Sequence, residues 1–243
     1  MNEEKERLWL PFPRALTKAT FIERANRFIL HCQLPEKGEL AVVHLADPGR
    51  LKELLLPGKT VWLMDHDNPA RKTKWTAMLC ENETNTSFVS IHTALPNKLV
   101  ENALKAGVLN EFAGWFYKKS EYKLGNSRWD FLLENKEGQE LLLEVKSVTL
   151  AEGEKGMFPD AVTARGTKHV RELAQLSKYY ETAILFIVQR DDLSYVTAAK
   201  HIDPKFAQAL NEAKSAGVKL YARCCHITVT GIGLGSAIPV KLE

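Results

Sequence analysis

The feature that most constrains the fold is a pair of apolar segments on either side of a polar turn, in RWDFLLENKEGQELLLEVKSVTL at residues 128–150. Two such segments around a short polar turn are typical of a β-hairpin. A turn over residues 135–139 places Asp130 opposite Glu144 and puts Lys146 on the same face as these acids. The opposite face is then uniformly apolar, with Phe131, Leu133, Leu141, Leu143 and Val145. Because a slip of one residue would scatter this apolar set over both faces, the pattern specifies the register.

The opposed acids Asp130 and Glu144 need a compensating charge. Carboxylates directly opposite each other have Cβ atoms roughly 4.5 to 5.5 Å apart, and like charges at that position are destabilising. Mg²⁺ compensates such a pair, since it binds one or two carboxylates together with water and phosphate oxygens. Lys146 can then polarise an attacking water or stabilise negative charge on phosphorus. The alternative interpretation is two half-exposed acids and a lysine salt bridge on a solvent-facing sheet surface.

The hydrophobic pattern divides the chain into two domains, residues 1–95 and residues 96–243. The first is predicted to contain short strands separated by Gly, Pro, Asn and Asp, with one short helix over residues 49–56, which favours a small barrel of the OB type. In the second, Asn97 is predicted to cap a helix, and strands and helices then alternate around a long polar loop at residues 151–165. The fold class expected is therefore α/β (α+β).

Composition excludes some classes of protein. Hydrophobic residues make up 45% of the 243 residues, enough for a sizeable core. The longest apolar run, AILFIV at residues 183–188, is far shorter than the roughly 18 residues of a membrane span. The opening segment lacks the apolar region of a signal peptide, and the four cysteines have no disulfide or zinc spacing. We therefore expect a cytoplasmic protein with free thiols and no membrane association.

The net charge of +3 is too small to indicate a polyanionic partner, so local clusters of basic residues must carry any such binding. Those in the first domain are Arg24, Arg27, Arg71, Lys72 and Lys74, the last beside Trp75, whose ring suits stacking on a base of a single strand. Those in the second domain are Arg165, Lys168 and His169, near a predicted helix start that favours phosphate. No second histidine has metal-ligand spacing to His169, which is therefore predicted to contact phosphate or substrate. The alternative interpretation of both clusters is ordinary solubilising charge.

Several motifs resemble those of the sugar fermentation stimulation proteins. They are RANRF, DPGRL, LPNKLVENAL, SRWDFLLE, LEVKSVTL, FPDAVTARGTKHVREL and FIVQRDD, and the resemblance extends over about residues 12–240. It implies an OB-like domain followed by a PD-(D/E)xK restriction-endonuclease-like domain with a mixed sheet, in proteins described as DNA-binding.

That resemblance also implies roles for individual residues. Asp130 and Glu144 take the places of the metal-binding acids, Lys146 that of the catalytic lysine, and Glu101 that of an accessory acid. DPGRL stands where many relatives have Asn-Thr-Gly-Arg-Met; it keeps Gly49 and Arg50 and changes a neighbouring polar residue. Arg50 is accordingly predicted to contact nucleic acid.

The predicted function is DNA binding combined with a Mg²⁺- or Mn²⁺-dependent phosphodiesterase site at Asp130, Glu144 and Lys146, with Glu101 in support. One alternative is a non-catalytic DNA-binding regulator of sugar metabolism genes, in which the acids are vestigial or only structural. A second alternative is an interaction protein of sugar metabolism that binds no nucleic acid. The sequence leaves open whether DNA or RNA is preferred. It also leaves open how many chains assemble, and a homodimer is one option.

Overall fold

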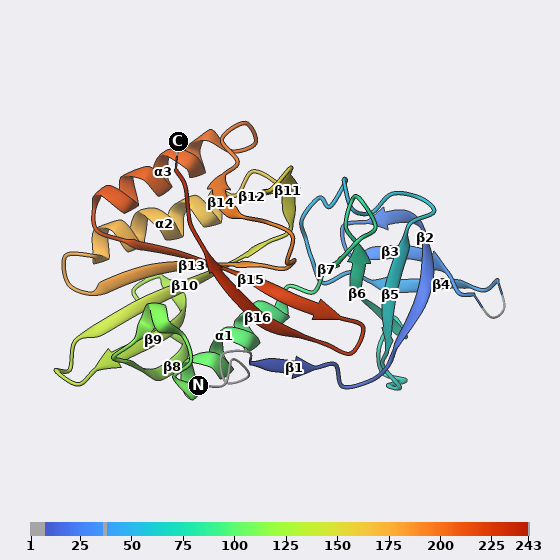
Figure 1. The fold of residues 1–243 in the computed structure, drawn as a ribbon, viewed down its shortest axis with the longest axis horizontal. Helices are drawn as coiled ribbons and strands as arrows, with labels where there is room; N and C mark the ends of the chain where they lie inside the picture. Colours follow the sequence, from blue (N-terminus) through green and yellow to red (C-terminus); the bar gives the residue numbers. More distant parts are fainter. Residues whose placement is uncertain (1–7, 36–37, 243) are drawn as a thin grey trace.

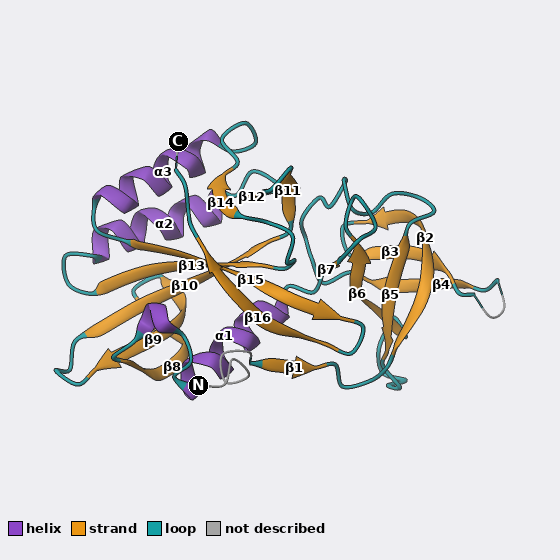
Figure 2. Cartoon of the chain, in the orientation of Figure 1, coloured by secondary structure: helices purple, strands orange, loops and turns teal. Residues whose placement is uncertain are grey.

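The structure, a computed structural model, describes residues 8–35 and 38–242. Residues 1–7 belong to the opening segment, which was predicted not to be a signal peptide. They lie outside the described residues. The chain forms a β-barrel and a larger mixed sheet with helices on both faces (Figures 1 and 2). All four cysteines are buried free thiols, as predicted. Within the described part of the chain, no helix is long and apolar enough to cross a membrane.

The barrel confirms the predicted OB-like domain. Its strands are β2 (Leu16–Asn26), β3 (Ile29–Gln33), β4 (Leu40–His44), β5 (Thr60–Asp65), β6 (Trp75–Glu81) and β7 (Phe88–Ser90). They pair in the order β4-β3-β2-β5-β6-β7, and a parallel pairing of β4 with β6 closes the first five strands into a barrel. Alternate side chains such as Phe21, Leu30 and Val43 fill the interior, which is the pattern that a small closed barrel requires.

The short helix predicted over residues 49–56 is not formed. Residues 52–54 are a turn. Leu51 has a φ of 48°, and its carbonyl accepts the N–H groups of Leu54 and Leu55 at 3.2 and 2.9 Å. Leu51 and Leu54 are fully buried in the barrel. The helical spacing of these leucines therefore reflects packing into the barrel interior.

The larger sheet has the order β1-β16-β15-β13-β10-β9-β8. Its strands are β1 (Trp9–Pro11), β8 (Trp115–Leu124), β9 (Ser127–Asn135), β10 (Glu140–Val148), β13 (Glu181–Val188), β15 (Lys219–Thr228) and β16 (Gly231–Ile238). The three central strands β10, β13 and β15 are parallel. Because such strands are covered on both faces, β13 is buried at every position after its first residue.

Two short elements replace the predicted polar loop at residues 151–165. Strands β11 (Leu150–Glu152) and β12 (Lys155–Phe158) form an antiparallel pair, and β12 also pairs with β14 (Tyr195–Ala198). In the small sheet β11-β12-β14, strands β11 and β12 carry the chain from the end of β10 to the start of the next helix (Figure 1).

Helices cover both faces of the larger sheet. Helix α1 (Ala94–Ala106) packs on the face formed by Phe131, Leu133 and the other predicted apolar residues of the hairpin. Helices α2 (Ala164–Leu176) and α3 (Pro204–Ser215) pack on the other face, and a single 3-10 turn, η2 (Asn110–Phe112), follows α1. The N-cap of α1 is Thr93, so the prediction of Asn97 as its cap is wrong. The mixed α/β domain itself is confirmed.

The first strand of the chain belongs to the larger sheet rather than to the barrel. Strand β1 pairs with β16, with Trp9 opposite Gly233 and Pro11 opposite Gly231. The chain then leaves the sheet and enters the barrel (Figure 1). The barrel is therefore attached to the larger sheet on both of its chain connections, through β1 and through α1.

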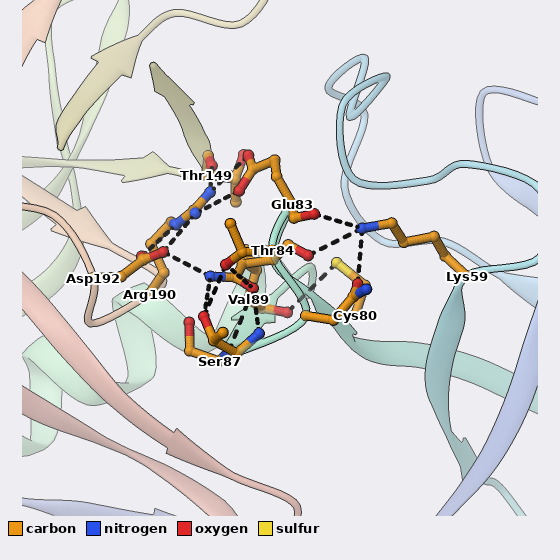
Figure 3. Close-up of polar contacts among 12 residues, drawn as sticks. Lys59, Cys80, Glu83, Thr84, Ser87, Val89, Thr149, Arg190 and Asp192 are labelled. Carbon is orange, nitrogen blue, oxygen red and sulfur yellow. Dashed lines mark hydrogen bonds and ion pairs between the residues drawn. The ribbon is translucent and has the colours of Figure 1, made fainter. Parts of the chain in front are cut away.

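A buried arginine also joins the barrel to the larger sheet (Figure 3). Arg190, which follows β13, is 2% exposed. Its guanidinium donates to Glu83 of the β6–β7 turn at 2.6 and 3.1 Å, and to Asp192 at 2.6 and 2.7 Å. Lys59 holds the same turn by donating to the carbonyls of Asn82 and Glu83, both at 3.1 Å. Since a buried guanidinium needs a partner for each donor, this cluster fixes the turn against the sheet.

Replacing this arginine by Arg190→Met should lower the free energy of unfolding by about 3 kcal/mol, because the substitution removes one partner of a buried charge cluster. We also expect the barrel to unfold before the larger sheet, which would give two transitions in urea denaturation followed by tryptophan fluorescence and circular dichroism. The control is Arg171→Met on the exposed face of α2, which should change the free energy by no more than about 0.5 kcal/mol. Equal effects of the two substitutions would contradict the assignment.

Candidate functional site

The hairpin has the predicted register. In the ladder between β9 and β10, Glu134 pairs with Glu140, Leu132 with Leu142, and Phe131 with Leu143. The backbone ladder ends at that last pair. Beyond it the N–H of Val145 donates to Oδ2 of Asp130 at 2.7 Å, so the Asp130 carboxylate takes the place of a backbone acceptor. The two acids are thus brought together where β9 and β10 stop pairing.

Glu144 is the most buried charged group of the site, at 4% exposure. Its Oε1 accepts hydrogen bonds from Nζ of Lys146 at 2.5 Å and from Nδ1 of His169 on α2 at 2.8 Å. Burial raises the pKa of Glu144, but the hydrogen bond from His169 and the charge of Lys146 outweigh it and lower the pKa below its ordinary value. Glu144 is therefore held as a carboxylate. Its other oxygen, Oε2, is buried and has no hydrogen-bond partner among the described residues.

Asp130 has different surroundings. Its Oδ1 accepts the side-chain amide of Asn97 on α1 at 2.7 Å, and its Oδ2 accepts the Val145 N–H. Burial and then the charge of Glu144 raise the pKa of Asp130 to about 6. Two carboxylates at one site thus have pKa values shifted in opposite directions, an arrangement that marks candidate functional groups.

These groups open onto one cavity of about 230 Å³. The charged or polar side chains that line it are Asn97, Glu121, Arg128, Asp130, Glu144, Lys146, Thr163, Arg165 and His169. Residues of α1 and α2 line the cavity together with the hairpin, so the acids are not on an open, solvent-facing surface. The alternative of two half-exposed acids with a lysine salt bridge is therefore wrong in the exposure of Glu144, whose side chain is only 6% exposed, although the salt bridge from Lys146 is present.

The donor set fits a divalent cation. The unpartnered Oε2 of Glu144 is an acceptor that folding has removed from water, and the charge of Glu144 adds to burial in raising the pKa of Asp130. Over residues 8–35 and 38–242, no group of three or more His, Cys, Asp or Glu side chains could hold a metal ion. The chain thus offers two carboxylates, and water or substrate would complete the shell, which is the arrangement that Mg²⁺ prefers.

Glu101 lies outside this cavity. Its carboxylate accepts hydrogen bonds from Lys105 at 2.7 Å and from the Tyr117 hydroxyl at 3.0 Å. The residue of α1 that reaches Asp130 is Asn97, about one helical turn earlier. Sequence reasoning missed this role of Asn97, although the four-residue spacing between the two positions was a usable signal.

Arg24 and Arg27 of the barrel bind the backbone of the 47–50 segment. Arg24 donates to the carbonyls of Gly49 and Arg50, both at 2.7 Å, and to those of Arg27 and Asp47 at 2.8 and 3.3 Å. Arg27 donates from Nε to the carbonyl of Pro48 at 3.2 Å and remains exposed. The guanidinium of Arg24 is therefore occupied by the protein itself.

The 47–50 segment also touches the second domain. Asp160, from the loop before α2, accepts the N–H of Arg50 at 2.7 Å, while the Arg50 side chain is exposed. Gly49 is required here, because a Cβ at this position would lie 2.1 Å from Oδ2 of Asp160. The DPGRL segment and the FPDA segment thus contact each other across the boundary between the domains.

The other predicted basic residues of the barrel lie in the β5–β6 connection and do not line the cavity of Asp130 and Glu144. Arg71 donates to the Thr76 hydroxyl at 3.0 Å, and Lys74 lies 3.4 Å from Asp65 and 5.3 Å from the centre of the Trp75 ring. Lys72 is exposed. On α2, by contrast, Arg165 and His169 line the site cavity, and Lys168 lines an adjoining one.

Comparison with known proteins gives matches over most of the chain. The family model described as "SfsA N-terminal OB domain" matches residues 22–91, and that described as "Sugar fermentation stimulation protein RE domain" matches residues 94–231. A sugar fermentation stimulation protein homolog from Shouchella clausii is 47% identical over 227 residues, covering 93% of this chain and 97% of the relative. Another, from Moorella thermoacetica, is 43% identical over 232 residues, covering 95% and 98%.

A solved structure has the same overall fold. The protein described as "The structure of Pyrococcus Furiosus SfsA in complex with Ca2+" is 29% identical, with a TM-score of 0.86, and the match covers 96% of this chain and 98% of that one. The barrel and the mixed sheet therefore occur together in a single related chain.

The buried carboxyl of Asp47 in the domain contact should make stability depend on pH. Burial and the charge of Asp160 raise its pKa to about 6. The folded protein therefore keeps a proton that the unfolded chain releases near pH 4, and stability falls as the pH rises from about 4 through 6. Asp47→Asn keeps an acceptor for the Gly49 N–H but removes the charge. At pH 7.5 its free energy of unfolding should exceed that of the wild type by about 2 kcal/mol, with no difference at pH 4.

Urea denaturation at the two pH values measures this difference. The control is Asp67→Asn, a removal of the same charge from a side chain that is 83% exposed. A wild type as stable as Asp47→Asn at pH 7.5 would contradict the expected cost of the buried charge.

Proposed function

Because the chain belongs to the sugar fermentation stimulation protein family, we propose that it is a DNA-binding protein with a Mg²⁺-dependent phosphodiesterase site at Asp130, Glu144 and Lys146. The observation that carries this proposal is the buried, unpartnered Oε2 of Glu144 beside a second buried carboxylate. A buried acceptor without a donor is costly, and a cation bound by Glu144 and Asp130 would satisfy it. The Ca²⁺ in the complex of the Pyrococcus furiosus relative supports a divalent cation in this family.

Each side chain of the site has a definable task. Lys146 and His169 occupy Oε1 of Glu144 and so leave Oε2 directed to other ligands. Asn97 and the Val145 N–H orient the carboxylate of Asp130. A bound Mg²⁺ or Mn²⁺ would supply Lewis-acid activation of water and of the phosphate. The ammonium of Lys146, at the wall of the cavity, stabilises the negative charge that develops on the phosphoryl oxygens during attack.

The contact between the domains supports DNA as the substrate. A cavity of about 240 Å³ at this contact is lined by Arg27 of the barrel and by Asp160, and it shares Phe158 and Thr163 with the site cavity. The exposed side chains of Arg27 and Arg50 lie at the barrel side of this path. A strand bound at the acids can thus continue along the junction toward cations of the barrel, which follow phosphates without reading the sequence.

Cleavage assays on single- and double-stranded DNA and on RNA test the proposal. With Mg²⁺ or Mn²⁺ we expect the wild type to cleave DNA, and we expect Asp130→Asn and Lys146→Met each to reduce kcat/KM by at least about a hundredfold, since each removes a group that acts on the reacting phosphate. The matched control is Glu134→Gln, which removes a charge from the exposed end of the same hairpin and should leave the rate unchanged.

The other outcomes separate the alternatives. Cleavage that survives both substitutions would refute the assigned site. Salt-sensitive DNA binding that is indifferent to Mg²⁺, without cleavage by any form, would favour the non-catalytic regulator. Failure to bind any polynucleotide at low salt would favour a role without nucleic acid.

Metal binding can be tested without activity. Mg²⁺ or Mn²⁺ at a hundredfold excess over Kd should stabilise the wild type by about 2.7 kcal/mol, visible as a rise in Tm. Glu144→Gln should abolish this rise, since it removes the carboxylate that carries the free oxygen. Glu140→Gln, at the other end of β10, serves as the control and should retain it. An equal rise in Tm for Glu144→Gln would show that the cation binds elsewhere.

A further inference from the structure

A basic recess adjoins the acidic cavity. Its cations are Lys123, Arg128, Arg165 and Lys168, and its volume is about 580 Å³. Lys123 and Arg128 stand on either side of the β8–β9 turn, whereas Arg165 and Lys168 project from the first turns of α2. The recess shares Arg128, Arg165 and His169 with the cavity of Asp130 and Glu144, so the two hollows are continuous.

The recess carries more positive charge than the chain neutralises. Arg128 lies 2.6 Å from Glu121, and Lys168 lies 3.6 Å from Glu172. These pairs are largely exposed and therefore weak. Lys123 and Arg165 are exposed and have no ion pair within the described ranges. Two cations without ion-pair partners among the described residues, one from the hairpin and one from the helix, line the same recess and can together bind a phosphate group.

The backbone adds to the same potential. Helix α2 begins at Ala164, which lines the recess, and the first N–H groups of a helix point out of its positive end. Thr163 accepts the N–H of Gly166 at 3.1 Å, so that part of the helix end is already satisfied. The recess is thus an anion site formed by side chains and supported by a helix terminus.

The site cavity has carboxylates that can hold a cation beside a scissile phosphate, whereas the described residues that line the basic recess include no acidic side chain. On the basis of the proposed function, we propose that the basic recess binds the phosphate next to the scissile phosphate in the same strand. The substrate is then a polynucleotide strand rather than an isolated phosphodiester. Since the recess lies on one side of the acids, it also sets the direction in which the strand runs through the site.

Three small DNA ligands test this inference: the dinucleotide TpT, the same compound with a 5′-phosphate, and the same compound with a 3′-phosphate. With Mg²⁺ present, we expect only one of the two terminal phosphates to improve on TpT. If the compounds are cleaved, kcat/KM should rise by at least about tenfold; if they are not, Kd should fall by at least about tenfold. The improvement should disappear in the double variant Lys123→Gln/Arg165→Gln.

The matched control is Lys136→Gln/Lys178→Gln, which removes the same charge from exposed positions at the opposite end of the sheet. It should keep the improvement, and both double variants should retain the wild-type Tm because all four side chains are exposed. No improvement by either phosphate, equal improvement by both, or an improvement that survives Lys123→Gln/Arg165→Gln would overturn the inference. An end-specific gain in Kd that Lys123→Gln/Arg165→Gln abolishes, in a wild type that cleaves nothing, would uphold the recess while refuting the phosphodiesterase.

Discussion

The burial of two neighbouring carboxylates at the end of a β-hairpin is the constraint on which the rest of this structure depends. Removing Glu144 from water requires donors in fixed positions, and Lys146 supplies one from the same strand. His169 on α2 supplies another, and Asn97 on α1 donates to the neighbouring Asp130. The helices on the two faces of the sheet are thus tied to one polar point, as well as to separate apolar cores. One oxygen of Glu144 has no donor among the described residues, and under the proposed function a bound cation would satisfy it.

The sequence was sufficient for the hairpin, because period-two alternation determines both register and face. It therefore predicted that Asp130, Glu144 and Lys146 meet. It could not predict the bond of His169 to Glu144, which depends on how α2 lies across the sheet. For Asn97 only the spacing from Glu101 was a signal, and its bond to Asp130 depends on how α1 lies. Local patterns also misled: Asn97 resembled a helix cap, and the leucines of residues 49–56 had helical spacing although they pack into a barrel. Arg24 has the composition of a phosphate contact but satisfies four carbonyls of its own domain.

The contacts between the domains have a bearing on binding as well as on stability. Arg190 joins the β6–β7 turn to the larger sheet, and Asp160 joins the 47–50 segment to the loop before α2. Both contacts are formed by buried or closely fitted polar groups, which tolerate little displacement. The cations of the barrel are accordingly held at a set position relative to the acids. Under the proposed function, a bound strand would meet a preformed surface and lose less ordering entropy on binding.

The pairing of β1 with β16 has a consequence for how the chain reaches this state. Trp9 is synthesised before the whole barrel, and its partner Gly233 is synthesised after it. The edge of the sheet therefore closes only after β16 has been made. Such a long-range pairing is slow to form. A ribosome that stalls before β16 releases a chain whose opening strand has no sheet to join, and an unpaired strand of this kind is a template for aggregation.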